Sequence, residues 1–214
     1  MKKEILIKKG AEASLYLQNW HNRKVIMKKR LSKKYRIQEL DRTIQAQRTK
    51  RESQIMHKAK EAGVPNPIVY FVDLLNSTIV MEFIEGKQVK QVLNDLPSNE
   101  RIKICKHIGE LVGKLHVAGI MHGDLTTSNM ILTLKDDIVF IDFGLSEQTW
   151  EVEARGVDLH LMKRAIMSTH FMHADECFKA VIDGYEKVLG KKATAEVLDK
   201  ITEIERRGRY ITER

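Results

Sequence analysis

The residues best suited to chemistry in this chain lie in one stretch, 122–144. Asp124 and Asn129 are five residues apart, and Asp142 follows thirteen residues later at the start of an Asp-Phe-Gly triplet. A carboxylate can accept a proton or orient the group that loses it, and carboxylate and amide oxygens together suit a hard cation such as Mg²⁺. Phosphoryl transfer needs these tasks, because it depends on positioning and charge neutralisation more than on covalent chemistry.

The same spacing is typical of the active site of protein-kinase-like enzymes. On this interpretation Asp124 is the catalytic base or orients a water molecule, and Asn129 and Asp142 are the metal ligands. Gly144 is expected to let the backbone bend behind Asp142. Asp and Asn also favour turns, so each residue alone could be structural. The joint pattern, with short apolar runs on both sides, favours the catalytic interpretation.

A positive side chain is needed upstream to grip the phosphates. Lys28 follows a short apolar strand, and strand alternation favours it over its neighbours Lys29 and Arg30. Glu52, in the long helix that follows, is the best partner to hold Lys28 in place. Glu39 is the fallback, and it is expected to lie before that helix. We therefore expect Lys28 and Glu52 to belong to the catalytic machinery.

Two further segments are expected to bind the nucleotide. A turn lies between two short strands ahead of Lys28, where a nucleotide-covering loop belongs, although it keeps one glycine where three are usual. Its residues are Gly10, Ala11, Glu12, Ala13 and Ser14. Their backbone N–H groups and the serine hydroxyl could contact phosphate oxygens. The backbone C=O of Glu82 and N–H of Ile84 are expected to bind adenine.

The elements that position these residues are expected to form two lobes. The sequence predicts strands over 4–6, 13–17, 24–29, 67–73 and 77–82, and a long helix over 43–62. After a linker at 84–86 it predicts helices over 89–93, 98–119, 158–170, 174–189 and 194–206, with short strands over 120–122 and 139–141. Ser98 is the expected N-cap of its helix. The predicted fold is α+β, a compact two-lobed protein-kinase-like fold. Its β-rich N-terminal lobe spans 1–84, and its short helical lobe with a basic tail spans 85–214.

Positive charge is clustered along the chain. There are 37 Lys and Arg against 29 Asp and Glu, a net charge of +8. Twelve of the basic residues lie between Arg23 and Arg51, with only Glu39 and Asp41 as acids, and the last nine residues are also basic. Such patches attract polyanions by counterion release. Because the excess is clustered, a nucleic-acid partner is favoured over a merely solvated helix face.

The remaining composition indicates an ordinary protein of the reducing interior. The N-terminus has two lysines but no apolar segment, and no stretch approaches about 18 uninterrupted apolar residues. We therefore expect neither a signal peptide nor a membrane span. Cys105 and Cys177, the two cysteines, form no CxxC pair. The expectation is a reduced, cytoplasmic protein without a membrane partner.

Together these motifs resemble the small kinase/ATPase subunit of the KEOPS (EKC) complex, which serves tRNA threonylcarbamoylation. The resemblance covers essentially the full length. Its most specific carriers are His-Gly-Asp-Leu-Thr-Thr-Ser-Asn at 122–129 and Lys-Tyr-Arg at 34–36. It implies ATP binding with Mg²⁺, ATP hydrolysis within the complex, and serine/threonine phosphorylation in isolation.

The resemblance also implies protein and RNA partners. The expected protein partners are the threonylcarbamoyl-transferring subunit and a small regulatory subunit of the complex. The basic N-lobe and the C-terminal tail, 206–214, are expected to meet tRNA. We expect this tail to be mobile and to reach tRNA near a shared active site, the alternative being a solubilising end.

The chain departs from ordinary protein kinases in two ways. Gly123 stands where most have an Arg before the catalytic Asp, so the guanidinium that would pair with an activation-loop phosphate is missing. Only fifteen residues separate Asp142 from Asp158, and no Ala-Pro-Glu occurs. A broad peptide-docking platform does not fit this length. The expected enzyme is an ATPase and atypical serine/threonine kinase with a dedicated partner.

Two other functions remain open on the sequence. One is a different kinase-like enzyme, either a RIO-like ribosome-assembly kinase or a small-molecule kinase of the aminoglycoside/choline type. The Asp-Phe-Gly-Leu-Ser run at 142–146 and the Lys-Tyr-Arg stretch argue against it. The other is a non-catalytic tRNA-binding scaffold. The presence of Lys28, Asp124, Asn129 and Asp142 argues against a dead enzyme.

Overall fold

The first third of the chain builds an antiparallel sheet with one helix packed on it. The structure is a computed structural model that describes residues 4–33 and 35–212. Five strands are arranged in the order β1-β2-β3-β5-β4. They are β1 (Ile5–Lys9), β2 (Ala13–Trp20), β3 (Arg23–Arg30), β4 (Val69–Asp73) and β5 (Thr78–Glu82). Strand β5 lies inside the sheet, which explains why its run Ile79-Val80-Met81 is apolar and buried.

Helix α1 (Gln38–Glu61) packs against β4 and β5 through Ile55, Met56 and Ala59, which lie on one helical face. It begins five residues before the predicted start, so Glu39 lies inside the helix and not before it. Hydrogen bonds to a polar side chain explain this early start. The buried carboxylate of Asp41 accepts hydrogen bonds from the Ser32 hydroxyl and the Lys33 N–H, which anchors a first turn that has no apolar periodicity.

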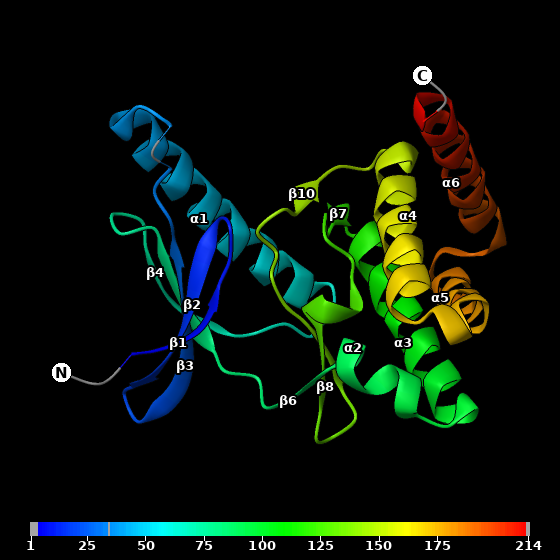
Figure 1. Cartoon of the computed structure of the whole chain (residues 1–214), viewed down its shortest axis with the longest axis horizontal. Coiled ribbons are helices and arrows are strands. Elements are labelled where there is room, and N and C mark those ends of the chain that lie inside the picture. The colour runs from blue at the N-terminus through cyan, green and yellow to red at the C-terminus, as the bar shows by residue number, and fades with distance from the viewer. Residues whose placement is uncertain (1–3, 34, 213–214) are drawn as a thin grey trace.

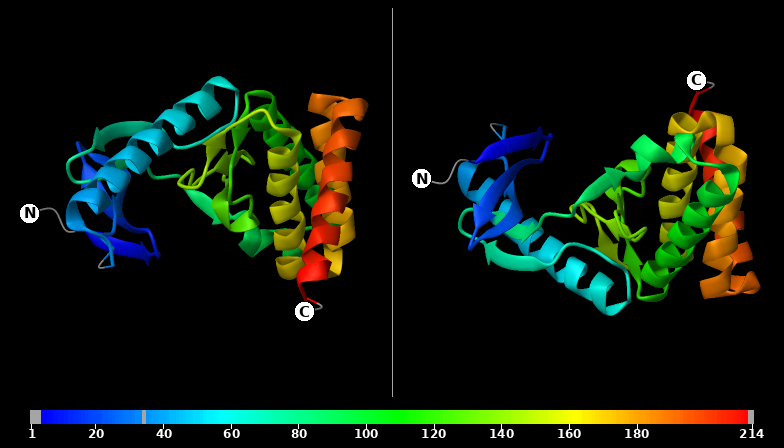
Figure 2. Two further views of the ribbon diagram at one scale, coloured as in Figure 1. Left: turned by 90° about the horizontal axis from the view of Figure 1, so that it is seen from above. Right: turned by 90° about the horizontal axis from the view of Figure 1, so that it is seen from below.

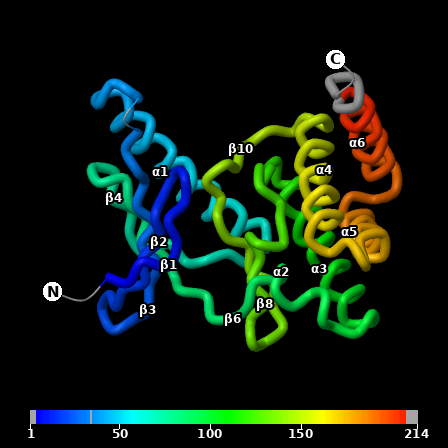
Figure 3. The backbone as a smooth tube through the Cα atoms, in the orientation of Figure 1, coloured from blue at the N-terminus to red at the C-terminus, as the bar shows by residue number. Residues whose placement is uncertain are grey.

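The rest of the chain is mostly helical, and Figure 1 shows the sheet and the helical part lying side by side. The long helices are α3 (Ser98–Val117), α4 (Val152–Thr169), α5 (Ala174–Leu189) and α6 (Lys191–Thr212), preceded by the short α2 (Val89–Val92). Figure 2 shows α1 running from the sheet towards the helical part, where Lys58 Nζ donates to Gln148 Oε1 at 2.7 Å. Figure 3 follows the single connection from β5 to β6.

Short strands and turns in the helical part carry the polar residues of the predicted site. One small sheet has the order β6-β8-β9 and another pairs β7 with β10. These elements are β6 (Gly86–Gln88), β7 (Ile120–Met121), β8 (Met130–Thr133), β9 (Ile138–Phe140) and β10 (Glu147–Gln148). Among the described residues there are also three 3₁₀ turns: η1 (Leu93–Asp95), η2 (Thr127–Asn129) and η3 (Phe171–His173). The two-lobed kinase fold predicted from the sequence is confirmed, while the division at residue 84 stays a prediction.

Several predicted boundaries are wrong. Pro97, not Ser98, is the N-cap of α3, and the Ser98 hydroxyl instead donates to Glu176 of α5. Helix α4 begins at Val152, six residues early, and α6 begins at Lys191. Helix α6 also continues through Thr212, so the backbone of residues 206–212 is helical, while the mobility of the tail stays a prediction. Lys34, residues 213–214 and the side chains of 208–212 lie outside the described residues. Within the described ranges, none of the helices combines the length and apolarity required to cross a bilayer.

A close helix contact joins α3 to α5 and depends on two glycines. A Cβ at Gly184 would lie 1.9 Å from the Lys106 carbonyl oxygen, and a Cβ at Gly109 would lie 1.9 Å from the Val181 carbonyl oxygen. Each contact involves backbone, which cannot swing aside as the end of a side chain can. The two helices therefore approach as closely as they do only because both positions lack a side chain.

We expect Gly184→Ala to lower the free energy of unfolding by about 1–3 kcal/mol, because the added methyl group forces α3 and α5 apart. Urea unfolding at neutral pH measures this. Lys179→Ala on the exposed side of the same helix is the control and should change stability by less than about 0.5 kcal/mol. Equal stability of the Gly184 variant and the wild type would contradict the tight crossing.

Candidate active site

A buried ion-pair cluster joins the sheet, α1 and the Asp-Phe-Gly triplet. Lys28 Nζ lies 2.6 Å from Glu52 Oε1 and 2.5 Å from Asp142 Oδ1, so the predicted Lys28–Glu52 pair is present. Burial alone would lower the pKa of Lys28, but the two carboxylates outweigh it and raise that pKa. Burial likewise would raise the pKa of Asp142, and Lys28 outweighs it and lowers that pKa. Lys28 and Asp142 are therefore both charged at neutral pH.

Asn129 and Asp124 form the second polar pair. The Asn129 amide nitrogen donates to the Asp124 backbone oxygen at 3.0 Å and to Asp124 Oδ2 at 2.7 Å. With its nitrogen committed to Asp124, the Asn129 side chain can offer its amide oxygen to a cation. The turn η2 places Asn129 there, because the Asn129 N–H bonds to the Thr126 carbonyl oxygen.

The backbone around the Asp-Phe-Gly triplet differs from our expectation. Asp142 itself has the left-handed conformation, with φ of 65°, whereas Gly144 has no positive φ. A Cβ at Gly144 would lie 3.1 Å from Asp142 Oδ1 and 3.2 Å from Lys28 Nζ, so glycine here leaves room for the ion pair of Lys28 and Asp142 beside the backbone. A strained non-glycine residue such as Asp142 is a common mark of a functional site.

A second buried carboxylate holds the segment that leads into Asp124. Asp158, 2% exposed, accepts hydrogen bonds from the backbone N–H groups of His122 at 2.7 Å and Gly123 at 2.9 Å, and it lies 3.2 Å from His116 Nε2. Burial would raise the pKa of Asp158, but His116 and the other donors lower it. Because α4 begins early, Asp158 lies in its second turn, beneath β7. These hydrogen bonds fix the backbone of His122 and Gly123, which directly precede the predicted base, Asp124.

Gly123 is required by the same anchor. Its φ is +79°, and a Cβ would lie 2.4 Å from the Leu145 carbonyl oxygen. An Arg in this place, as in most protein kinases, would meet both the unfavourable backbone conformation and the clash. The close packing of this loop against Leu145, in the segment after Gly144, thus explains why an arginine does not fit at position 123.

The predicted nucleotide-covering loop borders a cavity of about 260 Å³ beside the charged residues. Lining residues include Lys8, Lys28, Arg30, Asp124, Asp142, and Gly10 to Ala13 of the loop. The structure thus brings four of the five loop residues together with the charged residues. It does not bring Ser14, which lies in β2, is 2% exposed and lines neither this cavity nor the adjoining one. Ser14 pairs with Lys9 and Lys29 across the sheet, which turns it away from the cavity.

An adjoining cavity of about 210 Å³ continues towards the connection between the two parts. Its walls are largely apolar, and both Glu82 and Ile84 line it, together with Asn129 and Asp142. Its apolar lining is contributed by Ile7, Leu15, Ile26, Pro67, Met81, Phe83, Ile131 and Ile141. A flat, apolar base fits between such walls, with the charged groups at the other end.

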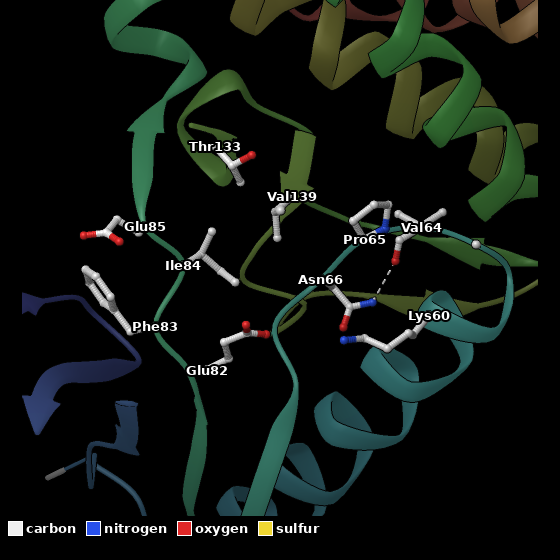
Figure 4. Close-up of a pocket in the computed structure, with 11 residues that line it drawn as sticks. Lys60, Val64, Pro65, Asn66, Glu82, Phe83, Ile84, Glu85, Thr133 and Val139 are labelled. Carbon is white, nitrogen blue, oxygen red and sulfur yellow. Dashed lines mark hydrogen bonds between the residues drawn. The ribbon is translucent and has the colours of Figure 1, made fainter. Parts of the chain in front are cut away.

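A larger cavity of about 610 Å³ also borders Glu82 and Ile84 but contains none of the catalytic candidates (Figure 4). Lys60, Asn66 and Val139 are among its other walls. Figure 4 shows the Asn66 amide bonded to the Val64 carbonyl oxygen, which fixes the loop between α1 and β4. This cavity is the larger one, but the charged candidate residues line the two smaller cavities. We therefore assign the candidate active site to the smaller cavities.

Sequence reasoning missed two residues that hold the site together. Asp158 appeared only as the expected start of a helix, and no local signal marks a buried acceptor within one. Arg30 appeared as a rival of Lys28, whereas in the structure it donates to the other oxygen of Glu52 at 2.6 Å. Its position two residues after Lys28 on a strand was a usable signal, because alternate strand residues share a face.

The buried imidazole of His122 makes stability depend on pH. Its Nδ1 accepts the Asp124 N–H and its Nε2 faces the Ile141 carbonyl oxygen, both at 3.3 Å, an arrangement that suits the neutral ring. Burial lowers the pKa of His122, against the opposing charges of Asp158, Asp142 and Asp124. Since the folded pKa is depressed, this contribution to stability is complete above the unfolded pKa of about 6.5 and is lost as the pH falls below it.

We therefore expect the free energy of unfolding to fall between about pH 6.5 and pH 5. His160 and His170, whose pKa values burial also lowers, act in the same direction. His122→Gln replaces the titrating ring and should reduce the slope by up to about 1.4 kcal/mol per pH unit. Urea unfolding at several pH values measures the slope in both proteins. An unchanged slope in the variant would show that His122 does not carry this dependence.

Comparison with known proteins gives the family. The protein kinase domain model matches residues 6–186. The chain is 50% identical over 211 residues to the protein of Pyrococcus abyssi named KEOPS complex subunit Bud32, covering 96% of each chain. It is 38% identical over 214 residues to the Dictyostelium discoideum EKC/KEOPS complex subunit bud32, covering 97% of this chain and 84% of that one.

A third relative is longer. It is a probable bifunctional tRNA threonylcarbamoyladenosine biosynthesis protein of Methanothermobacter thermautotrophicus, 43% identical over 205 residues. The match covers 96% of this chain but only 36% of that protein. Since the matches to both kinds of relative extend over nearly all of the chain and include the whole charged cluster, the chain belongs to the protein kinase family and, within it, to the atypical kinase/ATPases of the Bud32 type.

Proposed function

We propose that this protein is an ATP-dependent phosphoryl-transfer enzyme that supports formation of N6-threonylcarbamoyladenosine in tRNA as part of a KEOPS-type complex. The observation that carries the proposal is Lys28, held by Glu52 and Asp142 at the end of a cleft that also receives Asp124 and Asn129. The kinship with Bud32 supplies the biological setting. The cytoplasm is the compartment that we expect.

The residues present suit ATP with Mg²⁺. The Asp142 carboxylate and the Asn129 amide oxygen would hold the metal, which neutralises charge on the phosphates when bound. Lys28 would meet the phosphates from the other side, because Glu52 keeps its ammonium at the cavity. The apolar cleft would take the base, with backbone groups of Glu82 and Ile84 as its hydrogen-bonding partners.

Asp124 is the group that we assign to the acceptor. Asn129 binds one of its carboxylate oxygens, which fixes the side chain and leaves the other oxygen to accept or orient a proton. The acceptor is either water or a serine or threonine hydroxyl. Because Gly123 and the short segment after Gly144 leave no broad peptide platform, hydrolysis controlled by a dedicated partner is the reaction that we favour.

The distribution of charge supports partners within the complex. We assign the contacts to the threonylcarbamoyl-transferring subunit, to a small regulatory subunit and, through the basic residues of the N-lobe and the end of α6, to tRNA. At that end Arg206 is exposed, while Arg207 donates to Glu153 of α4 at 2.5 Å. Exposed arginines of this kind attract the phosphates of a polyanion.

Turnover of ATP tests the assignment of the catalytic residues. We expect Asp124→Ala and Asp142→Ala to reduce Mg²⁺-dependent ATP hydrolysis by about 100-fold or more, because the first removes the group that accepts or orients the proton and the second removes a proposed metal ligand. Phosphate release is measured with and without the transferase subunit and tRNA, and both should stimulate the wild type strongly. Asp137→Asn, an exposed carboxylate in the turn between β8 and β9, is the matched control. Ordinary turnover in either alanine variant would refute the assignment.

Affinity for tRNA tests the role of α6. We expect the double variant Arg206→Ala, Arg207→Ala, and deletion of residues 206–214, to weaken tRNA binding and to make the slope of log K against log salt shallower by up to about one for each phosphate that the tail no longer neutralises. The double variant Lys191→Ala, Lys192→Ala removes the same charge from the other end of α6 and should have little effect. An unchanged affinity and salt slope after the deletion would exclude the tail from RNA binding.

A further inference from the structure

One arginine connects the catalytic lysine to the nucleotide-covering loop. Arg30 follows Lys28 by two positions on β3, and both side chains reach Glu52 of α1. Lys28 Nζ binds Glu52 Oε1 and Arg30 Nη2 binds Glu52 Oε2, each at 2.6 Å. Glu52 is only 2% exposed, so water does little to stabilise its negative charge. The two cations do so instead.

The other side of the Arg30 guanidinium faces the loop. Arg30 Nη1 lies 3.6 Å from Glu12 Oε2, and Arg48 Nη1 binds both oxygens of Glu12 at 2.8 Å. The Arg30 side chain is 4% exposed, whereas those of Glu12 and Arg48 are each 41% exposed. Arg30 is thus the buried link, and Arg48 covers the same carboxylate from the solvent side.

Glu12 is the part of the loop that can transmit this link. Its backbone oxygen accepts the Leu31 N–H at 2.9 Å, and the Gly10 N–H closes the turn onto the Ala13 oxygen at 2.9 Å. The loop is therefore closed by its own backbone bond and tied to the end of β3, where Lys33 Nζ also donates to the Ala11 oxygen at 2.6 Å, and the Glu12 side chain adds the contact with Arg30. Since its residues line the same cavity as Lys28 and Asp142, its position determines whether backbone N–H groups can reach the phosphates.

The charges of the whole cluster balance. Lys28, Arg30 and Arg48 supply three positive charges, and Glu12, Glu52 and Asp142 supply three negative ones. An arginine suits the position between Glu52 and Glu12, because its planar guanidinium can contact two carboxylates at once. A lysine ammonium, on a flexible stem, is less well suited to this. The link between Glu52 and Glu12 therefore depends on the shape of Arg30 as well as on its charge.

We propose that Arg30 is a positioning residue of the nucleotide site. Together Glu12, Arg30 and Glu52 form a strut that holds the loop over the phosphates while Glu52 holds Lys28. The inference rests on the proposed binding of ATP and adds to it a coupling between two parts of the site. A partner that displaces α1 would move Glu52, and through the strut it would loosen the loop.

Nucleotide affinity and turnover, measured separately, test the strut. We expect Arg30→Lys and Glu12→Gln to raise the Kd for a non-hydrolysable Mg–ATP analogue, and the KM for ATP, by about tenfold while kcat changes by less than about threefold, because the loop binds but does not react. The control is Lys29→Gln. It removes a neighbouring charge on β3 that pairs with Glu4 at 3.0 Å at the surface, and it should leave Kd and KM unchanged.

Hydrogen exchange distinguishes a strut from a purely structural role. Glu52→Gln does not alter the loop itself, yet it removes the negative charge that anchors Arg30, so the backbone amides of 10–14 should exchange faster in this variant. A structural role alone would lower the melting temperature without changing Kd or loop exchange. That result, or wild-type affinity in Glu12→Gln, would overturn the inference. If instead the wild type itself fails to bind the analogue, the proposed function is wrong and the strut is not the cause.

Discussion

The structure depends on one buried carboxylate. Glu52 lies between the sheet and α1, where an unpaired charge would be very unfavourable. Lys28 and Arg30 compensate it from the same strand, one on each oxygen. This arrangement fixes the side of α1 that faces the sheet, the face of β3 that carries the charges, and the place where Asp142 can meet Lys28. The two smaller cavities, where we propose that the nucleotide binds, lie beside that cluster.

A second carboxylate performs the equivalent task in the helical part. Asp158 holds two consecutive N–H groups of the loop before Asp124, while His116 and Tyr185 complete the buried chain, with His116 Nδ1 2.8 Å from the Tyr185 hydroxyl. Each half of the site is thus held by one desolvated acid, and each of its two oxygens accepts at least one hydrogen bond. Such groups are costly when partly satisfied and rigid when fully satisfied, which suits a site that must position phosphates accurately.

The features that separate this chain from broad-specificity kinases have the same structural origin. The left-handed Gly123 allows both Asp158 contacts and the close approach of Leu145, and it leaves no room for the usual arginine. Control of the site must then come from elsewhere. The link from Glu52 through Arg30 to Glu12 connects α1 to the loop over the phosphates, so a protein or RNA that binds the basic N-lobe has a physical route to the reaction.

The sequence alone determined the reaction class, the two-lobed fold and the pairing of Lys28 with Glu52, because these rest on local spacing, strand alternation and residue chemistry. It misplaced the starts of α1, α4 and α6; in α1 the cause is Asp41, whose bonds to Ser32 and Lys33 anchor a first turn that lacks apolar periodicity. The sequence also predicted that the Ser14 hydroxyl contacts the phosphates, whereas in the structure this side chain is buried in the sheet. Only the tertiary structure decided the roles of Arg30, Asp158 and Gly123, since each acts through contacts with residues at least 18 positions away. Such contacts depend on how the elements pack, and no local pattern in the chain encodes them.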